Sequence, residues 1–430
     1  MLKVEKIIAI IKKNKSRFSS IGQYFFASLV PLILNIAINP LVAQNMSTED
    51  YATVGYFKSY NTLVLPIVLF YVLHYYTKRF YEVKEDERLI LKAYIFKFLF
   101  VASFVLALVS IACLYLYTIC FNADSQIPLY PYAWICLMSL PLTGIYSLVR
   151  TDYKMSQNSK NFLVISVIYS VLTAALLLFF VVFFKWGALG NLLSVFITNL
   201  VLFIYCSFKY RALFYIPTNF QNYKVILKFC TPLTVAATLG FFTNGYDRVY
   251  LERLGNVDEF GFYIVAFSIC NYLHVFADAV GNTFQPDIFR AIANRNTRSF
   301  FKYTMVILVM NALIVAVFVP LAPFVADILT AGKYLYSAGY MKILAVSSFA
   351  STVYFVISQF TVAVGLTNVT LYNKILTSLL SVAMFKVLID NFQFIGAAWG
   401  VSLSFVISSI GNLLFVYIYR SKLMCYWNKK

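Results

Sequence analysis

Polar side chains recur at helical spacing inside one long apolar stretch of the sequence. Asn271, His274, Asp278, Asn282 and Gln285 follow one another at steps of three, four, four and three residues, so on a helix they share one face. His274 and Asp278 lie one turn apart and can touch. Polar groups at membrane depth usually face a bundle interior or water, so this face is predicted to line a cavity. A polar seam packed against a neighbouring helix is the alternative, and the face also allows coupling to H+ or Na+.

A charged pair ends the apolar segment that precedes this stretch. Asp247 and Arg248 lie about twenty residues beyond Ile226, where the helix is expected to start, and thus near one mouth of a cavity. One interpretation is an interfacial ion pair at a helix end. The other is a cavity pair in which Arg248 meets an anionic group.

Four isolated cations and two amides also interrupt apolar sequence. The cations are Lys58, Lys97, Lys342 and Lys386. A lysine at the centre of a span costs about 2.5–3.5 kcal/mol on insertion scales, but near a helix end its long stem lets the ammonium group reach water. Each lysine is therefore either a cavity cation or a snorkelling side chain. Asn35 and Asn39, one turn apart beside Pro40, either line the cavity or bond to a neighbouring helix.

The elements that must position these residues are membrane-spanning helices. Hydrophobic residues make up 61% of the 430-residue chain and charged residues only 12%, whereas about a quarter of a soluble protein is charged. A span needs about 20 apolar residues, and no strand-like alternation is present. Uncharged runs of about that length occupy residues 18–48, 59–77, 98–123, 125–149, 161–184, 186–208, 229–246, 260–277, 303–326, 343–373 and 391–419. A twelfth span is predicted between Lys374 and Asp390, so the fold class is an all-α integral membrane protein with about twelve transmembrane helices.

The net charge of +18 follows the topology and does not indicate a nucleic-acid partner. With twelve spans, 27 of the 35 Lys and Arg residues lie on the side that holds both termini. Loops rich in Lys and Arg stay in the cytoplasm, so both termini are predicted to be cytoplasmic. The seven cysteines show no CxxC or Cys/His ligand spacing, which predicts neither a disulfide framework nor a metal or other cofactor site.

A weak internal repeat divides the chain into halves. Pro31 is followed by Glu49-Asp50-Tyr51-Ala52, and six spans later Pro232 is followed by Asp258-Glu259-Phe260-Gly261. An even number of spans per half predicts a parallel repeat related by an axis normal to the membrane. The predicted parts are a cytoplasmic interfacial segment (1–20), an N-terminal six-helix bundle (21–208), a cytoplasmic linker (209–226), a C-terminal six-helix bundle (227–419) and a cytoplasmic tail (420–430).

Three stretches of sequence carry a resemblance to a known family. They are Thr231-Pro232 with Gly245-Tyr246-Asp247-Arg248 and Asp258-Glu259-Phe260-Gly261-Phe262-Tyr263; Glu49-Asp50-Tyr51; and Gly396-Ala397-Ala398-Trp399-Gly400. With the topology of nearly the whole chain, they resemble the polysaccharide exporters of the multidrug/oligosaccharidyl-lipid/polysaccharide (MOP) superfamily, and specifically Wzx-type flippases of lipid-linked oligosaccharides.

The resemblance implies both an architecture and a substrate. The architecture is two six-helix bundles in a MATE-like V around a central cavity, alternating between inward-open and outward-open states. The substrate is an undecaprenyl-pyrophosphate-linked oligosaccharide, an O-antigen or related envelope glycan unit of lipopolysaccharide biosynthesis. It moves from the cytoplasmic to the outer leaflet of the bacterial inner membrane. Expected partners are membrane lipids and a glycan polymerase with its chain-length machinery. Because a pyrophosphate needs cations when it leaves water, the resemblance makes Arg248 the predicted headgroup ligand, Asp247 its counter-charge and the four lysines secondary candidates.

Two rival functions are weighed against the flippase. A cation-coupled multidrug antiporter of the same superfamily needs a carboxylate in the first span, and this sequence has no charged residue from Phe18 to Thr48. A membrane-embedded glycan polymerase or ligase needs a substantial external loop, and the longest one here has about a dozen residues. The sequence therefore predicts a transporter and no enzyme.

Overall fold

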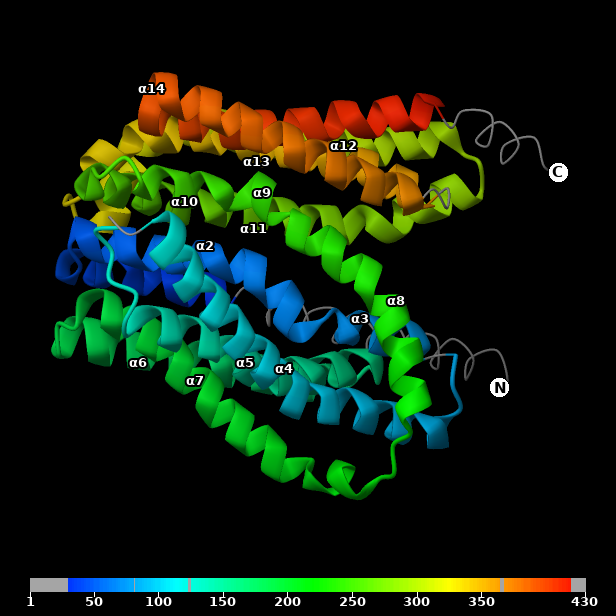
Figure 1. The fold of residues 1–430 in the computed structure, drawn as a ribbon. Helices are drawn as coiled ribbons and strands as arrows, with labels where there is room; N and C mark the ends of the chain where they lie inside the picture. Colours follow the sequence, from blue (N-terminus) through cyan, green and yellow to red (C-terminus); the bar gives the residue numbers. More distant parts are fainter. Residues whose placement is uncertain (1–29, 81, 123–124, 364–366, 419–430) are drawn as a thin grey trace, which may run out of the picture. The chain divides into compact units, whose positions relative to one another are not determined.

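The computed structural model describes residues 30–80, 82–122, 125–363 and 367–418, and within these ranges it contains helices and no strand (Figure 1). The predicted interfacial segment (1–20) and the tail (420–430) lie outside the described residues. The all-helical character follows from the composition, because in hydrocarbon a helix satisfies all of its own backbone hydrogen bonds.

The first half of the chain holds a series of long apolar helices. They are Val30–Asn45, α2 (Thr48–Leu69), α3 (Val72–Arg79), α4 (Glu85–Phe121), α5 (Tyr132–Met155), α6 (Ser159–Leu177), its π-helical continuation (Leu178–Phe183) and α7 (Gly187–Lys209). A short 3-10 turn (Arg211–Tyr215) follows. The helices of the second half are α8 (Phe220–Leu239), α9 (Phe241–Asn244), α10 (Tyr246–Glu252), α11 (Val257–Ala293), α12 (Thr297–Thr330), α13 (Ala338–Ala363) and α14 (Thr367–Ile418).

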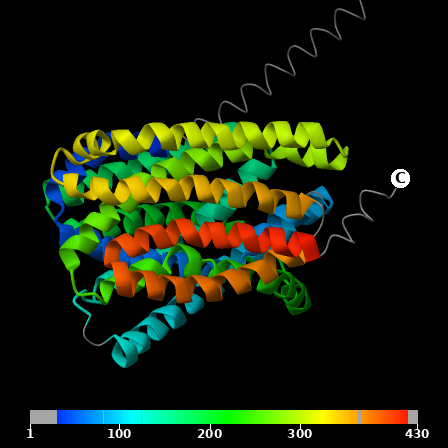
Figure 2. The same cartoon turned by 90° about the horizontal axis from the view of Figure 1, so that it is seen from above.

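Nine helices of the described chain are long and apolar enough to cross a membrane, or ten if α2 and α3, which meet at a 53° bend, form one span. α14 contains two of the predicted spans, because Gln393 (φ 49°) breaks it into two arms. The arms run antiparallel: Asn373 Nδ2 donates to the Ser408 carbonyl oxygen (2.9 Å), and Gly400 packs against Phe385. Figures 1 and 2 show these arms, in orange and red, side by side. The count of twelve stays a prediction, since the first predicted span extends outside the described residues.

Several helices begin before the apolar runs that predicted them. α2 starts at Thr48, whereas the apolar run starts at residue 59. A capping pair accounts for the early start: the Asp50 N–H donates to Ser47 Oγ (3.0 Å), and the Ser47 N–H donates to Asp50 Oδ2 (2.8 Å). α11 starts in the same way at Asn256, whose side chain accepts from the Glu259 N–H (3.1 Å). The paired acidic turns of the predicted repeat are therefore two helix N-termini.

The chain forms two compact units, which divide it differently from the predicted bundles. Unit 1 comprises residues 1–45, 67–114 and 129–231, and unit 2 comprises residues 46–66, 115–128 and 232–430. Unit 2 thus takes in the first part of α2 and the α4–α5 connection. The division into bundles 21–208 and 227–419 stays a prediction.

Unit 2 brings together the two helices that the repeat relates. A spacing of 209 residues relates Glu49-Asp50 to Asp258-Glu259, and the same spacing relates Gly55 to Ile264. A Cβ atom on Gly55 would lie 2.3 Å from the Ile264 side chain, so these two positions touch. At the helix starts, Thr48 donates a hydrogen bond to Asp258. α2 and α11 run parallel and begin at the same level. A twofold axis that runs between two such helices, along their length, brings equivalent positions into contact. The contact supports the predicted parallel repeat.

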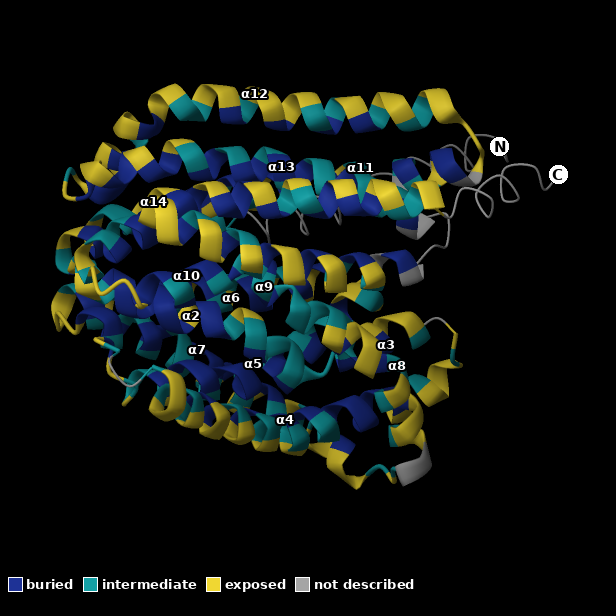
Figure 3. Ribbon diagram, turned by 45° about the horizontal axis from the view of Figure 1, so that its top comes forward, coloured by how far each residue is buried: buried dark blue, intermediate teal, exposed yellow. Residues whose placement is uncertain are grey.

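Burial separates the packed helix faces from the outer ones. α12 carries an exposed apolar stripe that starts at Phe301 and continues through Met305 and Val309, each one turn further along (Figure 3). Such a stripe suits contact with lipid. In contrast, α2 is buried at every position from Tyr51 to Tyr60 except Lys58.

Candidate functional site

A polar cavity of about 270 Å³ lies within unit 2, between α11, α13 and the second arm of α14. Its lining residues are His274, Ala277, Asp278, Ser351, Thr352, Tyr354, Phe355, Ser358 and Phe405. Two residues of the predicted polar stripe therefore do line a cavity. Hydroxyl groups and a carboxylate are partners that the hydroxyl groups of a sugar can use.

His274 is held by serines from α13. Its Nε2 lies 3.1 Å from Ser347 Oγ, and its Nδ1 lies 3.3 Å from Ser351 Oγ. Both serines also donate to backbone carbonyl oxygens of α13, Ser347 to Leu344 (2.6 Å) and Ser351 to Ser348 (2.8 Å), so their hydroxyl groups are fixed beside the ring. The contact of His274 with α13 replaces the contact with Asp278 that the spacing allows.

Asp278 lines the cavity without an ionic partner. It lies just past the midpoint of α11, and its side chain is exposed. Within the described residues, no hydrogen bond or ion pair reaches its carboxylate. A carboxylate at this depth is too costly to face lipid. Water access to the Asp278 side of the cavity therefore stays a prediction.

A cation that the sequence assigns to a cytoplasmic loop lies near this cavity. Lys374 is in the first arm of α14, and its Nζ lies 5.1 Å from the centroid of the Tyr354 ring, which lines the cavity. The Lys/Arg count assigns Lys374 to a cytoplasmic loop, because it directly precedes an apolar run. The structure instead places it in a helix, with its charge over an aromatic face.

Arg248 and Asp247 form a buried group on α10. Their side chains are 7% and 0% exposed, and Arg248 Nε lies 3.7 Å from Asp247 Oδ1. Tyr263 of α11 donates to Asp247 Oδ2 (2.7 Å), and the guanidinium carbon lies 4.1 Å from the centroid of the Phe267 ring. Arg248 also donates to the Asn244 carbonyl oxygen. This pair holds α10 against α11, so a headgroup role for Arg248 stays a prediction that requires the side chain to leave this packing.

The four predicted lysines lie in different environments. Lys58 is the single exposed position on an otherwise buried stretch of α2. Lys97 donates to the Ile216 carbonyl oxygen (2.6 Å) within unit 1, and so supports the segment after α7. Lys342 and Lys386 are exposed within two turns of a helix end or break, where snorkelling suffices.

The predicted asparagines also differ from one another. Asn271 of α11 and Asn35 of Val30–Asn45 are exposed, and Asn39 is half-buried with a partner of its own. Neither Asn35 nor Asn39 is among the residues that line the polar cavity.

One buried acid escaped sequence reasoning. Glu252, at the end of α10, is 7% exposed and accepts from Asn122 Nδ2 (2.9 Å) and Ser125 Oγ (2.5 Å). These residues belong to the α4–α5 connection, which is part of unit 2. An acid at the end of an apolar run looks like a loop residue in sequence, and only the fold brings its partners to it.

Sequence comparison and structural comparison give different results. No protein-family model and no curated protein matches the sequence. Solved structures do match over nearly the whole chain. An inward-facing multidrug resistance MATE family transporter of the MOP superfamily has a TM-score of 0.70 at 13% identity, covering 96% of this chain and 99% of that one. The lipid II flippase MurJ in an inward closed conformation has a TM-score of 0.69 at 13% identity, covering 95% and 92%.

A third match is a MOP superfamily transporter from Pyrococcus furiosus, described as having a binding pocket of reversed polarity. Its TM-score is 0.62 at 13% identity, covering 95% of each chain. At these identities the likeness concerns the fold. The chain is a multi-pass helical membrane protein with the fold of the MOP-superfamily transporters.

Proposed function

We propose that this protein is a flippase for a lipid-linked oligosaccharide with an anionic pyrophosphate headgroup, working by alternating access. The observation that carries the proposal is a cation beside the polar cavity of unit 2. Lys374 Nζ lies 5.1 Å from the centroid of the Tyr354 ring, which lines that cavity. Such a cation is costly in lipid, and its attraction to an anionic headgroup offsets that cost.

The structural neighbours include both a multidrug resistance transporter and a lipid flippase. One of them flips lipid II, which is lipid-linked. The hydroxyl-rich cavity beside Lys374 offers hydrogen-bond partners for sugars. The envelope glycan, the undecaprenyl carrier, the polymerase partner and the inner-membrane location remain parts of the proposal.

Deletion of the gene tests the proposal in cells. The expected result is loss of a surface glycan together with accumulation of its lipid-linked precursor inside. Complementation with Lys374→Gln should restore the glycan only partly at wild-type protein abundance, because it removes the cation beside the cavity. Lys342→Gln, an exposed lysine near a helix end, is the matched control and should restore it fully. Normal glycan in the deletion strain would refute the function.

A cation-coupled drug antiporter is the second candidate, and Asp278 is the observation that favours it. Its carboxylate lies unpaired in a cavity at membrane depth, and such acids often relay protons or bind cations. On this alternative, Asp278→Asn abolishes ion-driven efflux of a cationic dye from cells that overproduce the protein. The flippase proposal predicts that neither the wild type nor Asp278→Asn gives dye efflux above that of the empty vector.

A further inference from the structure

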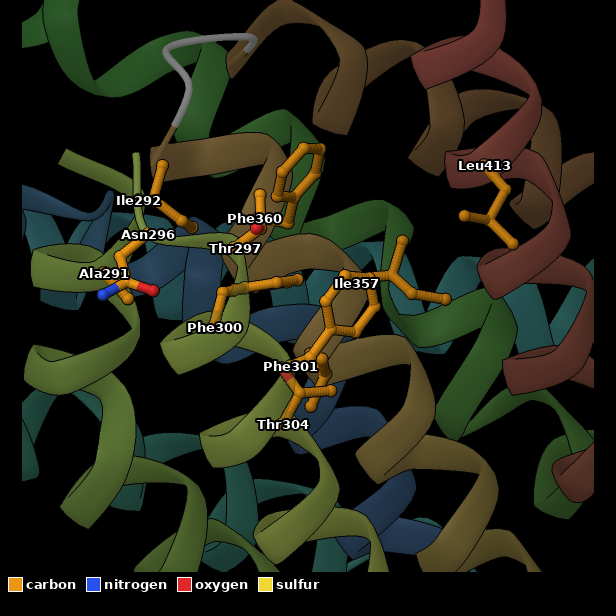
Figure 4. Close-up of a pocket in the computed structure, with 11 residues that line it drawn as sticks. Ala291, Ile292, Asn296, Thr297, Phe300, Phe301, Thr304, Ile357, Phe360 and Leu413 are labelled. Atoms are coloured by element: carbon orange, nitrogen blue, oxygen red, sulfur yellow. The ribbon is translucent and has the colours of Figure 1, made fainter. Parts of the chain in front are cut away.

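A second cavity of about 470 Å³ lies in unit 2 where α11 turns into α12. Its wall is apolar, and the residues that form most of it are Phe300, Phe301, Val356, Ile357, Phe360 and Leu413. Figure 4 shows Phe300 and Phe301 on α12, Ile357 and Phe360 on α13, and Leu413 on the second arm of α14. Asn296 and Thr297 lie at the turn itself.

The cavity spans the boundary between polar and apolar surface. Thr297 is the first residue of α12, and Thr304 lies two turns, or about 10 Å, further along the helix. Phe301, between them, begins the exposed apolar stripe of α12. The turn therefore lies in the interfacial region and the Thr304 end at the start of the hydrocarbon. At that depth an apolar chain fills the space better than water, because the wall offers almost no polar partner.

The α11–α12 turn beside this cavity is strongly basic. Arg290, Arg295, Arg298 and Lys302 surround the turn, and all four are exposed. One acid, Asp287, lies 3.6 Å from Arg290. Arg298 and Lys302 are one helical turn apart and flank Phe301, which lines the cavity. The preference for Lys and Arg in cytoplasmic loops accounts for the charges alone, but it does not account for an apolar cavity at the same turn.

We infer that this cavity binds one anionic glycerophospholipid of the leaflet at this end of the helices. The lipid's acyl chain lies against Phe301, Ile357 and Leu413, and its phosphate lies near Arg298 and Lys302. The occupant is a membrane lipid and not the transported substrate. The site is therefore independent of the proposed function.

Native mass spectrometry of the purified, delipidated full chain tests this inference. Phosphatidylglycerol and phosphatidylethanolamine with identical acyl chains are titrated separately. The wild type is expected to bind phosphatidylglycerol on the order of tenfold more tightly, because two lysine or arginine side chains near the headgroup each add attraction. The double variant Arg298→Gln/Lys302→Gln should bring the two lipids close to parity.

A cavity-filling variant separates the site from general surface charge. Ile357→Trp should weaken the binding of both lipids by occupying the acyl-chain space. The matched control uses an apolar cavity of about 370 Å³ further along α12, lined by Val315, Ala316 and Phe349. Ala316→Trp fills that cavity and should leave the phosphatidylglycerol preference unchanged.

Three outcomes would overturn the inference. Equal binding of the two lipids by the wild type is the first. The second is a phosphatidylglycerol preference that survives the double charge variant, together with unchanged affinity of Ile357→Trp for both lipids. The third is stoichiometric displacement of phosphatidylglycerol by undecaprenyl phosphate. That result would assign the cavity to an isoprenoid tail.

Discussion

At the scale of single residues, Asp278 and His274 share one face of α11 but differ in accessibility. Asp278 is exposed in the cavity, whereas serines of α13 hold both ring nitrogens of His274. In a background without native cysteines, Asn271→Cys and Asp278→Cys are expected to react readily with a small hydrophilic thiol reagent. Leu273→Cys, buried on the same helix, is the control and should be protected. Uniform protection of positions 271 and 278 would show that the stripe is a packing seam.

Arg248 supports a second prediction at this scale, because its structural and transport roles can be separated. Arg248→Ala leaves Asp247 as an uncompensated buried charge, which costs about 3–5 kcal/mol and should lower protein abundance. The double variant Asp247→Asn/Arg248→Met removes both charges and should recover much of that abundance, measured by quantitative immunoblot.

Surface glycan per unit of protein then decides the role of the guanidinium group. If Arg248 binds the headgroup, the double variant stays deficient in export. Export at the wild-type rate by the double variant would restrict Arg248 to structural packing and move the proposal to Lys58 and Lys374.

The residues show where sequence reasoning works and where it stops. The spacing of His274 and Asp278 placed both on one face, and the structure places both at one cavity. Lys374 was missed because a lysine at the edge of an apolar run has the same sequence signature in a loop as two turns inside a helix. The serines that hold His274 were missed because the pairing depends on how α13 packs beside α11, which no local pattern encodes.

At the scale of elements, the close packing of α2 and α11 depends on glycine. A Cβ atom on Gly261 would lie 2.3 Å from the Thr48 carbonyl oxygen, which is backbone and cannot move aside. Gly261→Ala should therefore lower stability by about 1–3 kcal/mol or more, seen as a lower thermal midpoint in detergent. Gly339→Ala, where a Cβ atom meets nothing within 4 Å, is the matched control. Equal midpoints for the two variants would contradict this packing.

Hydrophobic runs predicted the helices better than they predicted the ends of the helices. The run 186–208 corresponds to α7, Gly187–Lys209. The run 260–277, however, corresponds to only about half of α11, because that helix continues through polar sequence to Ala293. An uncharged run marks only part of a span, because polar residues that line a cavity, such as Asp278, end the run inside the helix. Caps such as Ser47 and Asn256, and a break such as Gln393, fix where the helix begins and ends.

At the scale of the whole molecule, the compact units cut across the predicted halves. Unit 2 holds the first part of α2 and the α4–α5 connection, joined to later helices by Thr48–Asp258 and by Glu252 with Asn122 and Ser125. The sequence predicts the repeat. It does not predict that segments of the first half belong to unit 2, since the bonds that hold them there join residues more than 120 positions apart. In an alternating-access cycle we expect these bonds to break when the end of the helices that holds Thr48 and Glu252 opens.

Glu252→Gln tests this role, because it weakens two charge-assisted hydrogen bonds to neutral ones. Ile127→Cys, at a buried position of the same connection, is expected to label faster with a hydrophilic thiol reagent in the Glu252→Gln background than in the otherwise wild-type chain. The control is Glu85→Gln, an exposed acid at the start of α4, which should leave the rate unchanged. Identical labelling rates in all three backgrounds would show that Glu252 does not keep this end closed.

The most direct test of the central claim is flipping by the purified protein. The full chain is reconstituted into liposomes with an undecaprenyl-pyrophosphate-linked oligosaccharide that carries a fluorophore on its sugar, and a membrane-impermeant quencher is added. Without protein, the quencher reaches only the outer leaflet. We predict that the protein makes nearly all of the labelled lipid accessible, and that Lys374→Gln slows this process. Quenching that stays at the protein-free level, while the same liposomes accumulate a cationic dye against an ion gradient, would contradict the flippase and establish the antiporter.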